Sequence, residues 1–129
     1  MGETLVEINI GELVKKEFEG FWKSVYEKKE PCDLSFLMYK EEGSPENYYF
    51  IGAIHDIHGL FPINGNIAGN RIWFRRHQNK MGFDYPYHYD YEGEIEVTEN
   101  GLYIIKGTWE SPYPNRARGI FEIKEKITR

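Results

Sequence analysis

The chain has 129 residues, enough for one continuous hydrophobic core and too few for two, so we expect a single domain over residues 1–129. Aromatic residues make up 16% of the sequence, a bias that suits half-buried strands, and the formal net charge of -5 argues against nucleic acid as a partner. The chain has one cysteine, acidic Glu3 and Glu7 where a secretory signal would be apolar, and no apolar run that could span a membrane; we therefore expect a cytoplasmic protein.

The first seventeen residues differ in pattern from the rest of the chain. Ile10, Leu13 and Val14 recur at spacings that suit a short amphipathic helix, while residues 5–10 also fit a brief strand. We expect residues 1–17 to form a short N-terminal cap, helical or extended, whose apolar side chains pack beneath the main body.

The remainder breaks into alternating runs separated by Gly, Pro, Asn and charged clusters. Eight such runs cover residues 18–27, 33–41, 48–57, 60–68, 71–77, 84–98, 102–110 and 118–127. Eight strands with short links predict an all-β fold, an eight-stranded antiparallel up-and-down barrel over residues 18–127. Glycines at inward positions would let the strands bend enough to close it; these are Gly20, Gly52, Gly93 and Gly107.

The longest run shows the clearest alternation. Between residues 85 and 97 every second residue is Tyr, Gly, Ile or Val, and the residues between them are mostly acidic. This period of two predicts a strand with one dry face. It places four phenols inside the barrel, from Tyr85, Tyr87, Tyr89 and Tyr91.

Turn lengths follow from the rule that paired residues face the same side of a sheet. The predicted links are two-residue turns at His58-Gly59 and Gly69-Asn70 and a three-residue loop at Glu99-Asn100-Gly101. The first turn places Asp56 opposite Phe61. In the third link a left-handed Gly101 forms a bulge, which pairs Val97 with Tyr103.

This topology gives the barrel two unlike ends. Inward residues at one end are apolar: Phe18, Met38, Phe50, Ile67, Ile72, Val97 and Ile123. Inward residues at the other end, the mouth, are largely polar or aromatic: Tyr26, Asp56, Arg76, Tyr85, Tyr87 and Trp109.

Buried Arg, Asp and phenol groups require partners, and two arrangements supply them. In one, the barrel is filled, Arg76 and Asp56 form an ion pair, and the phenols bond one another and trapped water. In the other, the mouth is a small-molecule pocket in which Arg76 attracts an anionic or carbonyl group, tyrosines donate hydrogen bonds and tryptophans stack on a flat body. The predicted ligand-binding residues are Trp22, Tyr26, Asp56, Arg76, Tyr85, Tyr87, Tyr89 and Trp109.

The segment Phe18-x-Gly20-x-Trp22 at the start of the first strand resembles the Gly-x-Trp opening of the lipocalins and avidins, the calycin group of ligand-binding barrels. The same rhythm recurs at Ile105-x-Gly107-x-Trp109 and Gly119-x-Phe121-x-Ile123. The resemblance covers residues 18–127 and implies a barrel that binds a small ligand. A lipocalin-like protein would also place a basic residue of the last strand over the first-strand Trp; Arg118 is nearest, and alternation turns it outward.

Other chemistry has less support in the sequence. His55 and His58 lie three apart on a predicted strand and turn, so they would not share a metal ion, and Cys32 has no His close in sequence. No phosphate-binding loop is present, and we expect no cofactor, no metal and no catalytic residue. An outward strip is a candidate surface for a partner or a homodimer; it consists of Arg71, Trp73, Arg75 and His77.

Reversible binding of a small, partly aromatic or apolar molecule in the mouth is the leading hypothesis. One alternative is a lipocalin-like enzyme of the isomerase, lyase or cyclase type that uses the Tyr, Asp and Arg groups of the same pocket. The other is a filled barrel that acts as an interaction module through its outer face.

Overall fold

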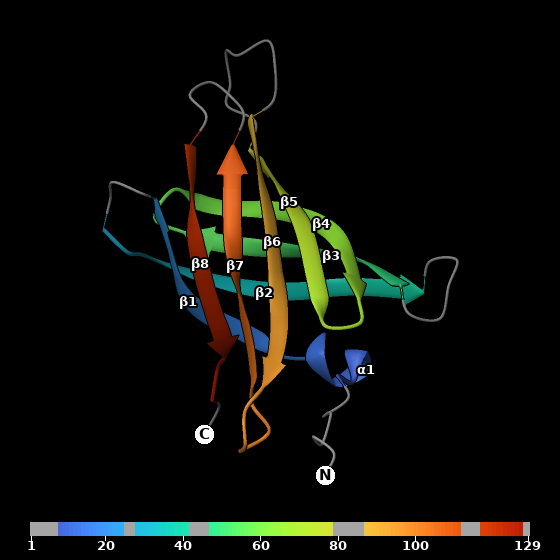
Figure 1. Ribbon diagram of the computed structural model, residues 1–129. Helices are drawn as coiled ribbons and strands as arrows, with labels where there is room; N and C mark the ends of the chain where they lie inside the picture. Colours follow the sequence, from blue (N-terminus) through green and yellow to red (C-terminus); the bar gives the residue numbers. More distant parts are fainter. Residues whose placement is uncertain (1–7, 25–27, 42–46, 79–86, 112–116, 128–129) are drawn as a thin grey trace.

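The computed structural model describes residues 8–24, 28–41, 47–78, 87–111 and 117–127. A short helix, α1 (Ile10–Leu13), precedes eight strands. These are β1 (Glu17–Ser24), β2 (Glu30–Glu41), β3 (Asn47–Asp56), β4 (Gly59–Ala68), β5 (Arg71–Gln78), β6 (Tyr87–Val97), β7 (Tyr103–Ser111) and β8 (Ala117–Glu125). Each strand pairs antiparallel with the next and β1 pairs with β8, so the sheet closes into an up-and-down barrel (Figure 1). The predicted fold class is confirmed.

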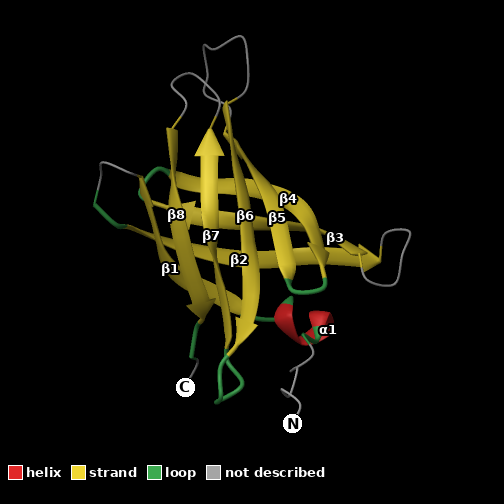
Figure 2. Ribbon diagram, in the orientation of Figure 1, coloured by secondary structure: helices red, strands yellow, loops and turns green. Residues whose placement is uncertain are grey.

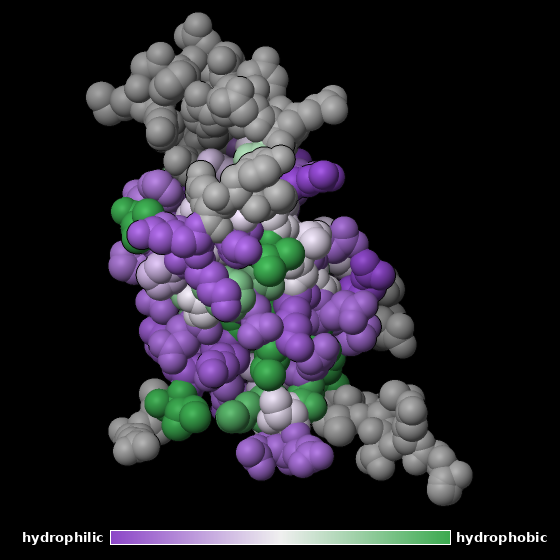
Figure 3. Space-filling model, turned by 60° about the vertical axis from the view of Figure 1, so that its left-hand side comes forward, coloured by the Kyte–Doolittle hydropathy of each residue, from purple (hydrophilic) through white to green (hydrophobic). Residues whose placement is uncertain are grey.

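The barrel wall follows the alternation seen in the sequence. In β6, Tyr91, Gly93 and Ile95 are buried while Glu92 and Glu94 are exposed. The face shown in Figure 3 is accordingly mostly hydrophilic, with scattered apolar side chains. Among the described residues no helix is long and apolar enough to cross a membrane.

Two of the three predicted links are confirmed. Gly69 and Asn70 form the turn between β4 and β5, and Ile67 pairs with Ile72 as expected. Between β6 and β7, Val97 pairs with Tyr103 and Gly101 has a φ of +81°, the left-handed conformation predicted for it.

The turn between β3 and β4 was predicted wrongly. It is formed by Ile57 and His58, so Asp56 pairs with Gly59 and not with Phe61. The carboxylate of Asp56 accepts a hydrogen bond from the backbone N–H of His58 at 2.8 Å, and Gly59 takes a φ of +126° that a side chain would disfavour. The register moves by two residues, so Phe61 keeps its inward face.

Met38 is a second correction. It is exposed at 53%, because the pairing of β2 with β3 is irregular between Phe36 and Met38 and the bulge reverses the alternation beyond it. Phe36, which precedes the bulge, keeps its inward position, with its ring 5.9 Å from that of Phe18 and 5.0 Å from that of Phe50.

Close approach of the strands explains the inward glycines. A Cβ at Gly107 would lie 1.9 Å from the carbonyl oxygen of Glu92 and 2.5 Å from Cα of Gly93. No side chain fits at that crossing, and its absence lets β6 and β7 coil closely enough for the barrel to close.

The helix closes one end of the barrel. It precedes β1, and Figure 2 shows it as the helical element of the described chain, set against a barrel of strands. Asn9 caps α1 by accepting a hydrogen bond from Glu12 N–H, and Leu13 is completely buried in the core. The predicted packing of the N-terminal segment beneath the barrel is therefore confirmed for Leu13, and Ile10 packs against the same core.

Aromatic rings fill the middle of the barrel. Phe74 and Tyr91 stack with centroids 4.6 Å apart and planes 9° from parallel, and Phe121 meets both edge-on. Phe74 and Tyr91 lie one inward position deeper than Arg76 and Tyr89, so they form a floor under the mouth.

Candidate functional site

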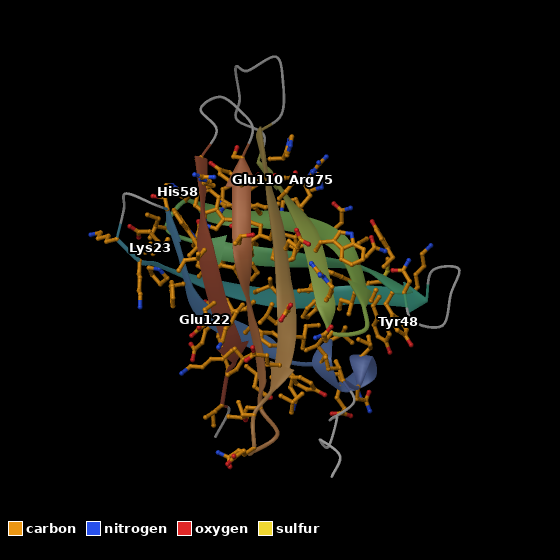
Figure 4. The ribbon with its side chains drawn as sticks, viewed as in Figure 1. Lys23, Tyr48, His58, Arg75, Glu110 and Glu122 are labelled. Atoms are coloured by element: carbon orange, nitrogen blue, oxygen red, sulfur yellow. The ribbon has the colours of Figure 1, made fainter. Side chains whose placement is uncertain are left out.

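A cavity of about 290 Å³ occupies the mouth of the barrel. Its wall is made where β1, β5, β6, β7 and β8 approach this end, together with the β3–β4 turn. The residues that line it are Trp22, Ser24, His58, Arg76, Tyr89, Tyr91, Trp109 and Ala117. His58 lies toward this end of the molecule in Figure 4.

A buried ion pair anchors the site. A terminal guanidinium nitrogen of Arg76 donates to Oδ2 of Asp56 at 2.7 Å, and the other terminal nitrogen approaches Oδ1 at 3.5 Å. Both side chains are at least 97% buried. This is the Arg76–Asp56 pair expected for a filled barrel, and it stands here beside an open cavity.

Two further donors saturate the Asp56 carboxylate. The indole Nε1–H of Trp22 donates to Oδ2 at 3.1 Å, and the backbone N–H of His58 donates to Oδ1. Asp56 therefore holds Arg76, Trp22 and the β3–β4 turn in place, and its oxygens are already engaged. A carboxylate arranged in this way is a structural anchor for the pocket wall.

Two buried N–H donors of the lining have no acceptor among the residues that the structure describes. Within the described part of the chain, neither Nε of Arg76 nor Nε1 of Trp109 has a hydrogen-bond partner. Both residues are at least 95% buried, and both line the cavity. The two nitrogen atoms themselves lie just beneath the cavity surface with almost no accessible area, so an acceptor reaches them after a small shift of the side chains. An unpaired buried donor costs about 1–3 kcal/mol, so such groups are normally satisfied by a ligand or an ordered water.

Aromatic rings supply the remaining wall. Trp109 meets Trp22 edge-on at 5.7 Å between centroids and Tyr89 at 5.8 Å, while His58 stacks on Trp22 at 6.2 Å. The guanidinium of Arg76 lies 5.3 Å from the centroid of Tyr89. These contacts fix the rings around the cavity and leave their remaining faces and edges for a flat molecule.

Burial raises the pKa values of two groups near the cavity, the Tyr91 phenol and the Cys32 thiol. Burial is the main cause that raises the pKa of the Tyr91 phenol above its ordinary value, opposed by the neighbouring Arg76. Burial also raises the pKa of the Cys32 thiol to about 12, with Asp56 and Asp33 adding to the shift. Both groups are therefore neutral near pH 7, and Cys32 lacks the thiolate that a nucleophile needs.

The structure brings together five of the eight predicted site residues: Trp22, Asp56, Arg76, Tyr89 and Trp109. Tyr26 and Tyr85 lie outside the described residues. For Tyr87 the backbone pairs with Gln78, while its side chain lies outside the described part.

Four lining residues were missed. Ser24, Tyr91 and Ala117 fall on the inward alternation of β1, β6 and β8, so the signal for them was present. His58 lies in the β3–β4 turn and is exposed, in keeping with its assignment to a turn. The residue types did not show that its backbone N–H binds Asp56 or that its ring stacks on Trp22.

Arg118 does not cover Trp22. It is exposed on the outer wall, where β8 places it opposite Glu110 of β7, and Trp22 takes Asp56 as its polar partner. The outward orientation inferred from alternation is confirmed. Among the described residues no three His, Cys, Asp or Glu side chains gather in an arrangement that could hold a metal ion.

Comparison with known proteins adds no family to this geometry. The sequence matches no protein-family model, and no curated protein is significantly similar to it. The function must therefore be argued from the closed barrel and the side chains at its mouth.

Proposed function

We propose that this protein is a cytoplasmic, lipocalin-like carrier that reversibly binds a small, partly aromatic or apolar molecule in the mouth of the barrel. The observation that carries the proposal is the pair of buried donors on Arg76 and Trp109, unpaired within the described chain, in the wall of an aromatic cavity. Apolar walls with a few convergent polar groups are the usual composition of a ligand site.

The size of the cavity supports a compact ligand. A cavity of about 150 Å³ holds benzene, and ligand pockets begin at about 300 Å³. A volume of about 290 Å³ therefore suits a molecule of one or two rings. Longer ligands would have to extend beyond the described lining, because Phe74 and Tyr91 close the barrel beneath.

Binding is favoured over catalysis by the state of the carboxylate. A general acid or base must exchange a proton with the substrate, whereas both oxygens of Asp56 already accept hydrogen bonds from protein groups. The cavity itself favours binding over a role confined to the outer face, since a filled barrel would leave no such space.

The test is a screen of aromatic fragments by ligand-observed NMR, followed by titration of hits against Arg76→Ala and the matched control Arg75→Ala. Arg75 is the next residue along β5, but it faces outward and pairs with Asp90. We expect Arg76→Ala to weaken binding about tenfold or more, because a hydrogen bond to a charged group contributes about 1.5–3 kcal/mol.

Arg75→Ala should leave the affinity unchanged. Equal affinities for wild type and both variants would place the fragment site elsewhere. If Arg76→Ala fails to fold, as judged by circular dichroism, Trp109→Phe gives the same test, since it removes one donor and keeps an aromatic ring in the wall.

A further inference from the structure

We infer that the ligand is an uncharged, flat molecule that presents a hydrogen-bond acceptor, such as an amide or ketone oxygen, to the unpaired donors of Arg76 and Trp109. The inference rests on the proposed binding function and adds the chemical class of the ligand. It resolves the choice between an anionic and a carbonyl group that the residue types alone left open.

The charge of Arg76 is already neutralised inside the site. Its partner Asp56 is fully buried and 2.7 Å away, so the pair presents no net charge to the cavity. An anionic ligand would have to leave water and then approach the Asp56 carboxylate as well as the guanidinium. The net charge of the chain, -5, also disfavours the approach of anions.

A cation is disfavoured for a different reason. In the described part of the lining the unsatisfied groups are N–H donors, Nε of Arg76 and Nε1 of Trp109, and a cation has no lone pair to offer them. Its charge would also face the guanidinium, which already lies over the rings of Phe61 and Tyr89 at 4.1 and 5.3 Å. A neutral acceptor satisfies the donors and brings no charge into the site.

Three probes of one shape separate these possibilities: naphthalene, 2-naphthamide and 2-naphthoate at neutral pH. Binding is followed by the indole N–H signals in ¹H–¹⁵N NMR spectra, each assigned from its Trp→Phe variant. The chain has three tryptophans. Trp109 carries the unpaired donor, Trp22 is bonded to Asp56, and Trp73 is 41% exposed on the outer wall and serves as the internal reference.

We expect 2-naphthamide to shift the Trp109 N–H signal downfield, to leave Trp73 in place and to bind about tenfold or more tightly than 2-naphthoate, a difference of about 1.4 kcal/mol. Tighter or equal binding of 2-naphthoate would overturn the inference and leave the binding function standing. Naphthalene binding as tightly as the amide would do the same, because no acceptor would then be needed. If none of the probes moves the Trp109 signal, the proposed function fails and the inference fails with it.

The variant Asp56→Asn gives a second test of the preference for a neutral ligand. This change keeps the shape of the side chain and removes the charge that neutralises Arg76, so the preference should shift toward 2-naphthoate by about tenfold or more. An unchanged preference in a folded variant would contradict the role given to Asp56. Should the variant not fold, the wild-type comparison of the amide with the carboxylate still decides the question.

Discussion

Replacing Asp56 with alanine should destabilise the barrel far more than replacing any exposed acidic residue. The change leaves the guanidinium of Arg76, which is only 2% exposed, without its carboxylate. It also removes the acceptor from the indole N–H of Trp22 and from the backbone N–H of His58. Removing one partner of a buried ion pair costs about 3–5 kcal/mol of unfolding free energy. Because two further donors lose their acceptor, we expect the cost for Asp56→Ala to lie near the upper end of that range.

The matched control is Asp90→Ala. Asp90 accepts a hydrogen bond from Arg75 at 2.8 Å, close to the 2.7 Å of the buried pair. The side chains of Asp90 and Arg75, however, are both 39% or more exposed. A solvent-exposed pair contributes about 0–1 kcal/mol, so this variant should unfold near the wild-type midpoint. Both variants break an Arg–Asp pair, so the difference between them reports the burial of the Asp56 pair together with the two further donors that Asp56 binds.

The assay is urea unfolding followed by tryptophan fluorescence and circular dichroism, with the double variant Asp56→Ala/Arg76→Met completing the comparison. Since the cost arises from a charge left unpaired, removing that charge too should move the midpoint back toward wild type. A loss below about 1 kcal/mol for Asp56→Ala, or a double variant as unstable as the sum of its single changes, would refute the reasoning.

Two further predictions concern stability. The pKa of the Cys32 thiol is raised by burial from 9.0 to about 12, so its stabilisation is complete below pH 9.0 and is lost as the pH rises toward 12. Cys32→Ala should therefore reduce the alkaline fall in unfolding free energy by up to about 1.4 kcal/mol per pH unit, and an unchanged slope would argue against a buried thiol. Gly107→Ala should cost about 2 kcal/mol or more, because its Cβ would meet backbone at 1.9 Å. Gly11→Ala, with no atom nearer than 3.4 Å, should be neutral or stabilising, and similar urea midpoints for the two variants would contradict the close strand crossing.

Alternation in the sequence was sufficient to predict the barrel and most of the mouth. The side-chain period of a strand is two, so once Tyr91 and Trp109 are assigned inward, a hairpin must pair them, as β6 and β7 do. The same rule brought Trp22 and Arg76 to one end of the barrel, although they lie 54 positions apart in the chain.

Alternation gave the wrong result at the β3–β4 turn and at Met38, because a local feature there sets the strand register and alternation does not show it. Two registers of the β3–β4 hairpin keep Phe61 inward, and the bond from His58 N–H to the Asp56 side chain selects the one observed. At Met38 one extra residue in β2 reversed the pattern, and nothing in the flanking residues marks a bulge.

Whether the interior is full or open depends on side-chain volume and orientation, which a pattern of residue types does not contain. Phe74 and Tyr91 stack across the middle, so the lower barrel is filled, whereas Trp22 and Trp109 meet edge-on and leave space beside them. The interior is thus filled in its lower part and open at the mouth.

A crystal structure of the protein soaked with 2-naphthamide tests the binding site most directly. The geometry predicts density for the ligand in the mouth, with the amide oxygen within hydrogen-bonding distance of Arg76 Nε or Trp109 Nε1 and the rings against Trp22 and Tyr89. A mouth that stays empty while the amide binds only on the outer wall, or side chains that fill the cavity completely, would contradict it.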